Sequence, residues 1–238
     1  MQGELEKALA QVANHEARIT TCGRTDTGVH ALGQVAHFDS PAERSERSWI
    51  LGLNSNLPEA ISVLWVRPVD DEFHARFSAY ARSYRYRILN RWVRPALENQ
   101  RVSWVRRPLD AEAMQVAAQY LLGEHDFTSF RASGCQATHA VREIHAISVS
   151  REGDVINLDV TANGFLYHMV RNIAGSLLRV GSGEAPPSWV QEVLNAQDRK
   201  QAAPTAQPDG LYFLGARFPE HFGLPDRPAT FPGKETLT

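Results

Sequence analysis

A short polar loop between two strand-like stretches holds the first residues that could do chemistry. Asp26 lies within GRTDTGVH (residues 23–30), where threonines flank it and glycines bracket the loop. The glycines let the backbone turn tightly and present the Asp26 carboxylate outward. Aspartate in such a loop also serves as a turn former or cap, so the loop alone leaves both interpretations open. It lacks the lysine and the spacing of a phosphate-binding loop.

Two further side chains stand out against their surroundings. Arg171 interrupts an apolar helical stretch, between Met169–Val170 and Ile173–Ala174. Its side chain can snorkel at the edge of the helix, or point inward and pair with a carboxylate, which would keep that acid ionised. Tyr84 can be a core residue of a strand, or an aromatic that stacks on an extruded base.

Basic charge is concentrated in one segment of a chain whose net charge is −2. Residues 76–107 hold nine arginines and a single acid, Glu98, so this segment carries +8 and the remainder −10. A basic stripe on an acidic body is typical of a phosphate-binding surface, although a solvated charged face is the alternative. Arginine outnumbers lysine 22 to 3, and arginine suits phosphates and base stacking, which favours RNA.

Composition excludes several other classes of protein. No apolar run approaches the roughly 18 residues of a membrane span. Cys22 and Cys135 lie far apart without CxxC spacing, which argues against a structural zinc site or a disulfide framework and suits a cytoplasmic protein.

The hydropathy pattern predicts helices and strands in alternation. In the clearest strand, Ser83–Asn90, tyrosines and Ile88 share one face and arginines the other. Asp110 and Gly123 bracket one helix, and Ser188 has capping-box spacing to Gln191. Helices are predicted around Leu5–Val12 and over Ser48–Leu57, Asp110–Leu122 and His168–Val180; other strands over Arg18–Cys22, Gln34–Phe38, Ile61–Arg67, Val141–Arg151, Val155–Thr161 and Gly210–Phe218; and the tail from Pro219 is predicted to be irregular.

Both halves of the chain follow the order helix, two strands, helix, strand, which predicts an α+β fold. We predict two pseudo-repeated, ferredoxin-like α/β halves that share a mostly antiparallel sheet, with the active site in the cleft between them. Residues 1–80 form the N-terminal half with the Asp26 loop. Residues 81–238 form the C-terminal half with the basic segment and a Pro-rich tail.

Seven blocks of the sequence, in order, resemble the TruA family of tRNA pseudouridine synthases. The family signature is Arg-Thr-Asp followed by Gly-Val-His, as at residues 24–30. The blocks are GRTDTGVHALGQVAHF at 23–38, NLP at 56–58, FHARFSA at 73–79, RSYRYRI at 82–88, LLGEHDFTSFR at 121–131, FLYHMVRNIAGSL at 165–177 and DGLYFLGA at 209–216.

The resemblance implies a role for each matching residue. Asp26 is similar to the aspartate that attacks the target nucleotide, Tyr84 to the tyrosine that packs on the uracil, and Arg171 to the arginine that pairs with the aspartate. Arg24 resembles the arginine that fills the space left by the flipped base. The wider RNA-binding set is expected to be Arg24, His30, Arg76, Arg82 and Arg131.

The resemblance also implies the reaction and the assembly. Family members are homodimers without metal or organic cofactor, and they convert uridines 38, 39 and 40 of the tRNA anticodon stem–loop to pseudouridine. The sequence leaves open whether the carboxylate attacks C1′, attacks C6 or removes the 2′ proton. The expected first strand and its aromatic loop are missing before Gln2, so we expect Met1 to be a misassigned start. Thr27 stands where alanine is usual, without an expected consequence.

Two other functions fit parts of this pattern. A non-catalytic RNA-binding module would explain the basic segment, but it does not require Asp26, Tyr84 and Arg171 together. A metal-dependent hydrolase would need ligands that the sequence does not space as a motif. The histidines considered for it are His30, His37, His125, His139 and His168.

Overall fold

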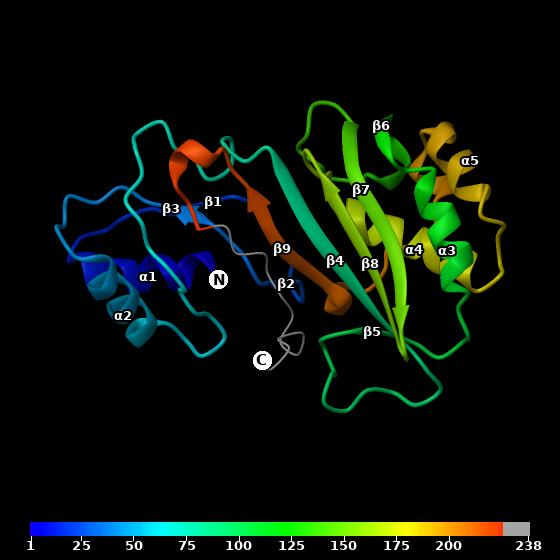
Figure 1. Ribbon diagram of the computed structural model, residues 1–238, viewed down its shortest axis with the longest axis horizontal. Helices are drawn as coiled ribbons and strands as arrows, with labels where there is room; N and C mark the ends of the chain where they lie inside the picture. Colours follow the sequence, from blue (N-terminus) through cyan, green and yellow to red (C-terminus); the bar gives the residue numbers. More distant parts are fainter. Residues whose placement is uncertain (226–238) are drawn as a thin grey trace. The chain divides into compact units, whose positions relative to one another are not determined.

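The computed structural model describes residues 1–225, which form two compact units (Figure 1). The smaller unit comprises Met1–Arg24, Gln34–Tyr80 and a stretch that begins at Arg217. The larger unit comprises Thr25–Gly33 and Ala81–Ala216, and therefore includes Asp26. Among the described residues, none of the helices has the length and apolar character needed to cross a membrane.

Two amphipathic helices build the core of the smaller unit. The stripe predicted around Leu5–Val12 is confirmed, because Leu9 and Val12 are buried against Trp49 and Leu53. The two strands expected on either side of the Asp26 loop form an antiparallel pair, each shorter than predicted. The elements of this unit are α1 (Gln2–Ala13), α2 (Glu46–Asn56), β1 (Thr20–Thr21), β3 (Ala36–His37) and η4 (Glu220–Phe222).

The strand predicted over Ile61–Arg67 is wrong, because this stretch has no regular structure. The Asn54 side chain of α2 donates to the Val63 carbonyl and accepts from the Val63 amide, both at 2.8 Å. A side chain therefore satisfies the backbone groups that a neighbouring strand would otherwise bind. Val63 and Val66 of this stretch still pack against the core of the unit.

A seven-stranded sheet forms the centre of the larger unit in the described part of the chain. Its order is β2-β9-β4-β8-β7-β6, and β5 pairs with β4 at one end. The β4–β8–β7–β6 ladders are antiparallel, so the predicted α+β class and mostly antiparallel sheet are confirmed. The strands are β2 (His30–Ala31), β4 (Ala81–Asn90), β5 (Ser103–Val105), β6 (Gly123–Asp126), β7 (Val141–Glu152), β8 (Val155–Ala162) and β9 (Leu211–Arg217).

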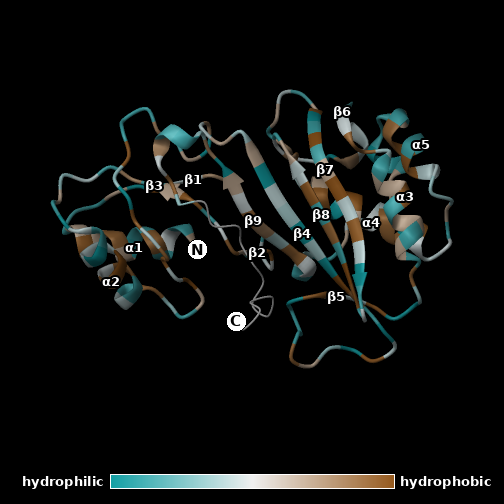
Figure 2. Cartoon of the chain, viewed as in Figure 1, coloured by the Kyte–Doolittle hydropathy of each residue, from teal (hydrophilic) through white to brown (hydrophobic). Residues whose placement is uncertain are grey.

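Two helices, α3 and α4, pack against one face of this sheet, and α5 packs against these helices (Figure 1). Hydrophobic and hydrophilic residues alternate along β4, β7 and β8 (Figure 2), as the period of a half-buried strand requires. Tyr86 and Ile88 are fully buried on the helix-facing side, which confirms the predicted face of β4. The elements are α3 (Ala111–Gln119), α4 (Met169–Gly181), α5 (Trp189–Ala196), η1 (Thr128–Phe130), η2 (Arg199–Gln201) and η3 (Pro208–Gly210).

The helix ends test the capping predictions. Asp110 caps α3, because its carboxylate accepts from the amides of Glu112 and Ala113. The capping box at Ser188 is wrong, since the Ser188 side chain makes no capping hydrogen bond and its backbone is already helical. The strands β2, β5 and β6 were not predicted because two to four residues show no clear period.

Some of the predicted architecture goes beyond these observations. The pseudo-repeat of ferredoxin-like halves, the site between them and the division at residue 80 stay predictions. The tail predicted to be irregular includes η4, and its residues 226–238 lie outside the described part of the chain.

Candidate active site

The Asp26 loop is fixed to the edge of the large sheet by its own backbone. The Asp26 carbonyl accepts from the Val29 amide at 3.1 Å, which closes a tight turn. Gly28 in this turn has φ +83°, and a Cβ there would lie 3.0 Å from Pro208 Cγ. After the turn, β2 pairs in parallel with β9. Position 28 therefore requires glycine, both for its positive φ and for its close packing against Pro208.

The Asp26 carboxylate faces two side chains from the start of α4. Its Oδ2 lies 3.0 Å from His168 Nε2 and 3.4 Å from Arg171 Nη1. Both contacts are to Oδ2, and among residues 1–225 no group donates a hydrogen bond to Oδ1. The side chains of Asp26, His168 and Arg171 are 32%, 21% and 14% exposed, respectively. The cluster is thus largely shielded from water while one carboxylate oxygen is left for a substrate.

The segment 202–209 orients the Arg171 guanidinium. Arg171 Nε donates to the Ala206 carbonyl at 2.8 Å, and the Ala206 amide donates to the Arg171 carbonyl at 3.1 Å. The segment can approach α4 because Gly175 is one turn beyond Arg171, where a Cβ would lie too close to the Pro204 carbonyl oxygen. The Arg171 side chain therefore points inward to a carboxylate, as one of the two sequence interpretations predicted, and does not snorkel at the edge of the helix.

Partly buried hydrogen bonds hold segment 202–209 in place. The amide oxygen of Asn172, which is fully buried on α4, accepts from Thr205 at 2.6 Å and from Arg199 at 3.0 Å. The Tyr86 hydroxyl donates to the Gln207 carbonyl at 2.8 Å. Burial raises the pKa of Tyr86 to about 12, so this hydroxyl stays protonated and remains a donor. The position of Arg171 thus depends on a connected and satisfied network.

His168 is the member of the cluster that sequence reasoning missed as a site residue. It precedes α4 with φ 58° and ψ 11°, a left-handed conformation that is uncommon outside glycine, although histidine, asparagine and aspartate adopt it more often than other residues. Its ring stacks on Tyr167, with centroids 3.9 Å apart. Burial lowers the pKa of His168, and the Arg171 cation lowers it further, against the opposing effect of Asp26. Its spacing of three residues from Arg171 was the available sequence signal.

Tyr84 belongs to the same sheet, two strands from the Asp26 loop. Its ring packs edge-on to Phe165 at 5.0 Å and tilted to Phe213 at 5.1 Å. Phe213 on β9 is the register partner of Ala31 in β2. The half-buried Tyr84 is therefore linked through Phe213 to β2, the strand that follows the Asp26 turn. Its catalytic role stays a prediction.

The five predicted RNA-binding residues are scattered over different elements. Arg24 and Arg76 are exposed and belong to the smaller unit. In the larger unit, Arg82 donates to the Asn163 carbonyl, and Arg131 donates to the carbonyls of Cys135 and Ala137. His30 Nε2 lies 2.8 Å from the Gln100 carbonyl oxygen, and its ring stacks on Tyr212. RNA contact by these residues stays a prediction.

Part of the basic stripe serves the fold. Four of its nine arginines form ion pairs and a fifth stacks on tryptophan, which reduces the charge available to a ligand. These contacts are Arg85–Asp159, Arg87–Glu98, Arg91–Asp154, Arg107–Glu184 and Arg106 over Trp92. A solvated charged face does not describe these five arginines either, because each has a specific partner within the fold.

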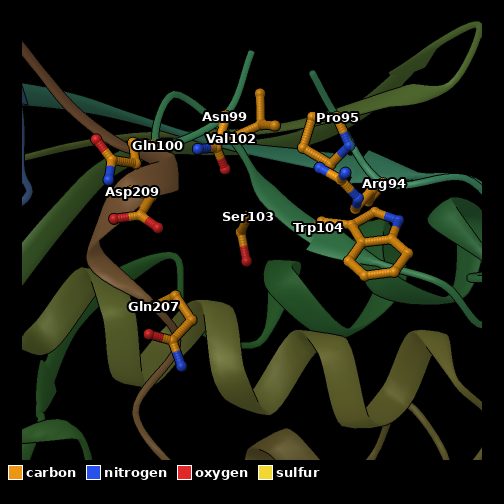
Figure 3. Close-up of a pocket in the computed structure, with 9 residues that line it drawn as sticks. All are labelled: Arg94, Pro95, Asn99, Gln100, Val102, Ser103, Trp104, Gln207 and Asp209. Carbon is orange, nitrogen blue, oxygen red and sulfur yellow. The ribbon is translucent and has the colours of Figure 1, made fainter. Parts of the chain in front are cut away.

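A hollow with both polar and apolar lining residues lies in the larger unit (Figure 3). Asp209 in its wall is also near Gly28, since a Cβ on that glycine would lie 3.4 Å from Asp209 Oδ1. Amide, hydroxyl, guanidinium and indole side chains line the rest of the hollow. The hollow is lined by Arg94, Pro95, Asn99, Gln100, Val102, Ser103, Trp104, Gln207 and Asp209.

The histidines considered as metal ligands are dispersed. His125 Nε2 lies 2.9 Å from the Leu122 carbonyl oxygen, and His37 Nδ1 accepts from the Ala75 amide. Over residues 1–225 there is no group of three or more His, Cys, Asp or Glu side chains that could hold a metal ion. The hydrolase alternative therefore has no ligand set in this part of the chain.

Comparison with known proteins assigns the family. A family model described as tRNA pseudouridine synthase matches residues 1–78 and 117–219, so the chain belongs to that family and the predicted resemblance is confirmed. Proteins named tRNA pseudouridine synthase A are similar over most of their length. That of Xylella fastidiosa (strain M23) is 56% identical over 225 residues, 94% of this chain and 88% of that protein. Those of Nitrosococcus oceani and Coxiella burnetii (strain Dugway 5J108-111) are 52% identical, over 97% and 96% of this chain and 90% and 87% of theirs.

Proposed function

We propose that this chain isomerises uridine to pseudouridine in tRNA, at positions 38, 39 and 40 of the anticodon stem–loop. The observation that carries the proposal is the Asp26 carboxylate, held through one oxygen by Arg171 and His168 in a chain of the pseudouridine synthase family. A non-catalytic RNA-binding module would not need a shielded carboxylate with a second oxygen available.

The proposed reaction rearranges bonds without a net gain or loss of atoms. The N1–C1′ bond of uridine breaks, the uracil turns within the site, and a C5–C1′ bond forms. The proton on C5 leaves and N1 becomes protonated, so no redox cofactor is needed. We assign Asp26 as the nucleophile that forms a covalent intermediate with the nucleotide. The carboxylate at pH 7 has its charge balanced by Arg171.

The target uridine must leave its base stack before Asp26 can reach it. Unstacking costs a few kcal/mol, and less in a loop or at the end of a stem. We assign Tyr84 to pack on the extruded uracil and Arg24 to occupy the vacated position. The remaining phosphate contacts are assigned to His30, Arg76, Arg82 and Arg131. The hollow of Figure 3 adds amide and indole groups that suit unpaired nucleotides.

The experiment is mapping of pseudouridine in tRNA transcripts incubated with the purified chain. Wild type should modify uridines 38, 39 and 40, and Asp26→Ala should modify none. Binding of the same tRNA by both proteins, measured as retention on a filter, shows whether the variant still recognises RNA. Product formed by Asp26→Ala would refute the catalytic assignment. Binding without any product from wild type would favour the RNA-binding module.

We further propose a cytoplasmic homodimer without metal or organic cofactor. The support is the family resemblance and, for the location, the tRNA substrate. Light scattering should give twice the mass of one chain, 26.5 kDa. Activity should persist in excess chelator. A mass of one chain at the concentrations of the activity assay would contradict the dimer.

A further inference from the structure

We propose that His168 is a positioning residue that fixes the Asp26 carboxylate for attack. This inference rests on the proposed function, because it concerns the same site. His168 donates its Nε2 hydrogen to Oδ2, and together with Arg171 it restricts that oxygen and directs Oδ1 toward the substrate.

The contact geometry separates the roles of the two neighbours. His168 Nε2 is 3.0 Å from Asp26 Oδ2, whereas Arg171 Nη1 is 3.4 Å away. The shorter contact comes from the imidazole, and the arginine directs its best hydrogen bond, at 2.8 Å, to the Ala206 carbonyl. Arg171 therefore supplies the charge and a longer contact from a fixed fork, and His168 supplies the shorter contact to the carboxylate. Two donors on one oxygen also restrict rotation of the carboxylate, which a single donor would permit.

The backbone of His168 is arranged for this contact and not for capping the helix. The residue precedes α4, but its side chain makes no capping hydrogen bond. A left-handed conformation is unfavourable for a residue with a Cβ, and such conformations cluster at functional sites. Tyr167 stacks on a face of the imidazole, with ring planes 29° apart, while Nε2 at the ring edge contacts Asp26. The ring is thus held between an aromatic surface and the carboxylate.

The surroundings of His168 favour the neutral imidazole, which can still donate one hydrogen bond. The groups that influence it are Asp26 on the loop, Arg171 on α4 and Arg199 of η2. Burial lowers the pKa of His168 below the ordinary 6.5, and both arginines act in the same direction. With a neutral imidazole, the positive charge of Arg171 balances the negative charge of Asp26. Protonation would add a second cation and weaken Asp26 as a nucleophile.

Two substitutions separate positioning from structure. His168→Asn keeps a residue that tolerates the left-handed conformation, but its side chain is too short to reach Asp26. His168→Gln keeps an N–H donor at about the reach of Nε2 and never becomes charged. His145→Gln is the matched control, because His145 Nε2 lies 3.6 Å from Glu143 in an exposed histidine–carboxylate pair of the same unit.

The measurements are kcat and KM for pseudouridine formation on a tRNA transcript, with thermal unfolding of each variant. We expect His168→Asn to lower kcat by about 10²-fold, the effect of a misplaced reacting group, with KM changed less than about twofold. His168→Gln should recover at least about tenfold of this loss. His145→Gln should match wild type. Equal losses for Asn and Gln, or full activity of His168→Asn, would overturn the positioning role.

The pH profile gives a second readout that a purely structural role would not move. Wild-type kcat should fall as the pH drops through the lowered pKa of His168, and His168→Gln should shift this fall to lower pH. If His168→Asn does not fold, this profile decides, and an unshifted profile overturns the proposal. Absence of product from wild type, or product from Asp26→Ala, would instead refute the proposed function itself.

Discussion

Asp26 and Asp159 are two aspartates of the larger unit that each face an arginine, and they differ in how their oxygens are used. Asp159 on β8 is opposite Arg85 on β4, and the guanidinium binds both carboxylate oxygens, at 2.6 and 2.9 Å. Asp26 accepts its hydrogen bond from Arg171 at one oxygen, Oδ2, at 3.4 Å, and His168 Nε2 lies 3.0 Å from the same oxygen. Their exposed fractions are almost equal, 31% and 32%, so burial does not distinguish them.

The difference teaches how geometry separates a structural pair from a candidate active site. A bidentate pair between adjacent strands occupies both oxygens and fixes both side chains, which leaves little capacity for a ligand. The Asp26 cluster spreads its donors over an arginine and a histidine and leaves Oδ1 available. Reactive groups are commonly held by several partners of this kind.

The largest expected effect comes from neutralising each aspartate in turn. Asp26→Asn should lower the rate of pseudouridine formation by about 10³-fold or more, because an amide is not a nucleophile. Asp159→Asn should leave the rate within about twofold, while both variants lose about 1 kcal/mol of stability, as partly exposed ion pairs do. Single-turnover rates and urea unfolding measure the two effects. A rate loss in Asp159→Asn at unchanged tRNA affinity would break the comparison.

Replacing each arginine with lysine tests the geometry at constant charge. Arg171→Lys should lower kcat by about 10- to 100-fold, because lysine cannot contact the Ala206 carbonyl and Asp26 with one fixed fork. Arg85→Lys should cost about 1 kcal/mol of stability or less, with kcat unchanged. Steady-state kinetics and urea midpoints check both. Full activity in Arg171→Lys would show that charge alone is sufficient.

Gly175→Ala probes the segment that orients Arg171. The added methyl would meet the Pro204 carbonyl oxygen, so overpacking should cost about 1–3 kcal/mol. The displaced Ala206 carbonyl should also lower kcat. Gly3→Ala is the matched control in α1, where a Cβ meets nothing within 4 Å, and it should stabilise by up to about 1 kcal/mol. Thermal unfolding of both variants measures these effects, and destabilisation of equal size would contradict the packing argument.

The smallest expected effect is the pH dependence of stability that His168 contributes. Its pKa is lower in the folded chain than the ordinary 6.5, so at acidic pH the unfolded state binds more protons. Stability from this group is therefore present above pH 6.5 and declines as the pH falls through the lowered pKa. Urea unfolding at about pH 8 and about pH 5.5 should show a larger loss for wild type than for His168→Gln. The His145→Gln variant, changed at an exposed histidine, should lose as much stability between these two pH values as wild type does.

Local features of this chain were predictable from sequence because they depend on neighbouring residues. The alternation on β4 identified its buried face, Asp110 identified the start of α3, and the apolar stripe identified α1. Predictions failed where tertiary contacts replaced local ones. The Ile61–Arg67 stretch binds a side chain of α2 instead of a strand, and short strands such as β2 exist only because β9 is beside them.

The sequence by itself determined the family, the reactive loop and the arginine on α4, since these lie in contiguous motifs. Only the tertiary structure brought Asp26 within 3.4 Å of Arg171, 145 residues away, and placed His168 beside the same oxygen. It also decided which arginines of the basic stripe pair within the fold. Periodicity and turn chemistry encode local conformation, whereas the distance between remote side chains depends on how the whole core packs.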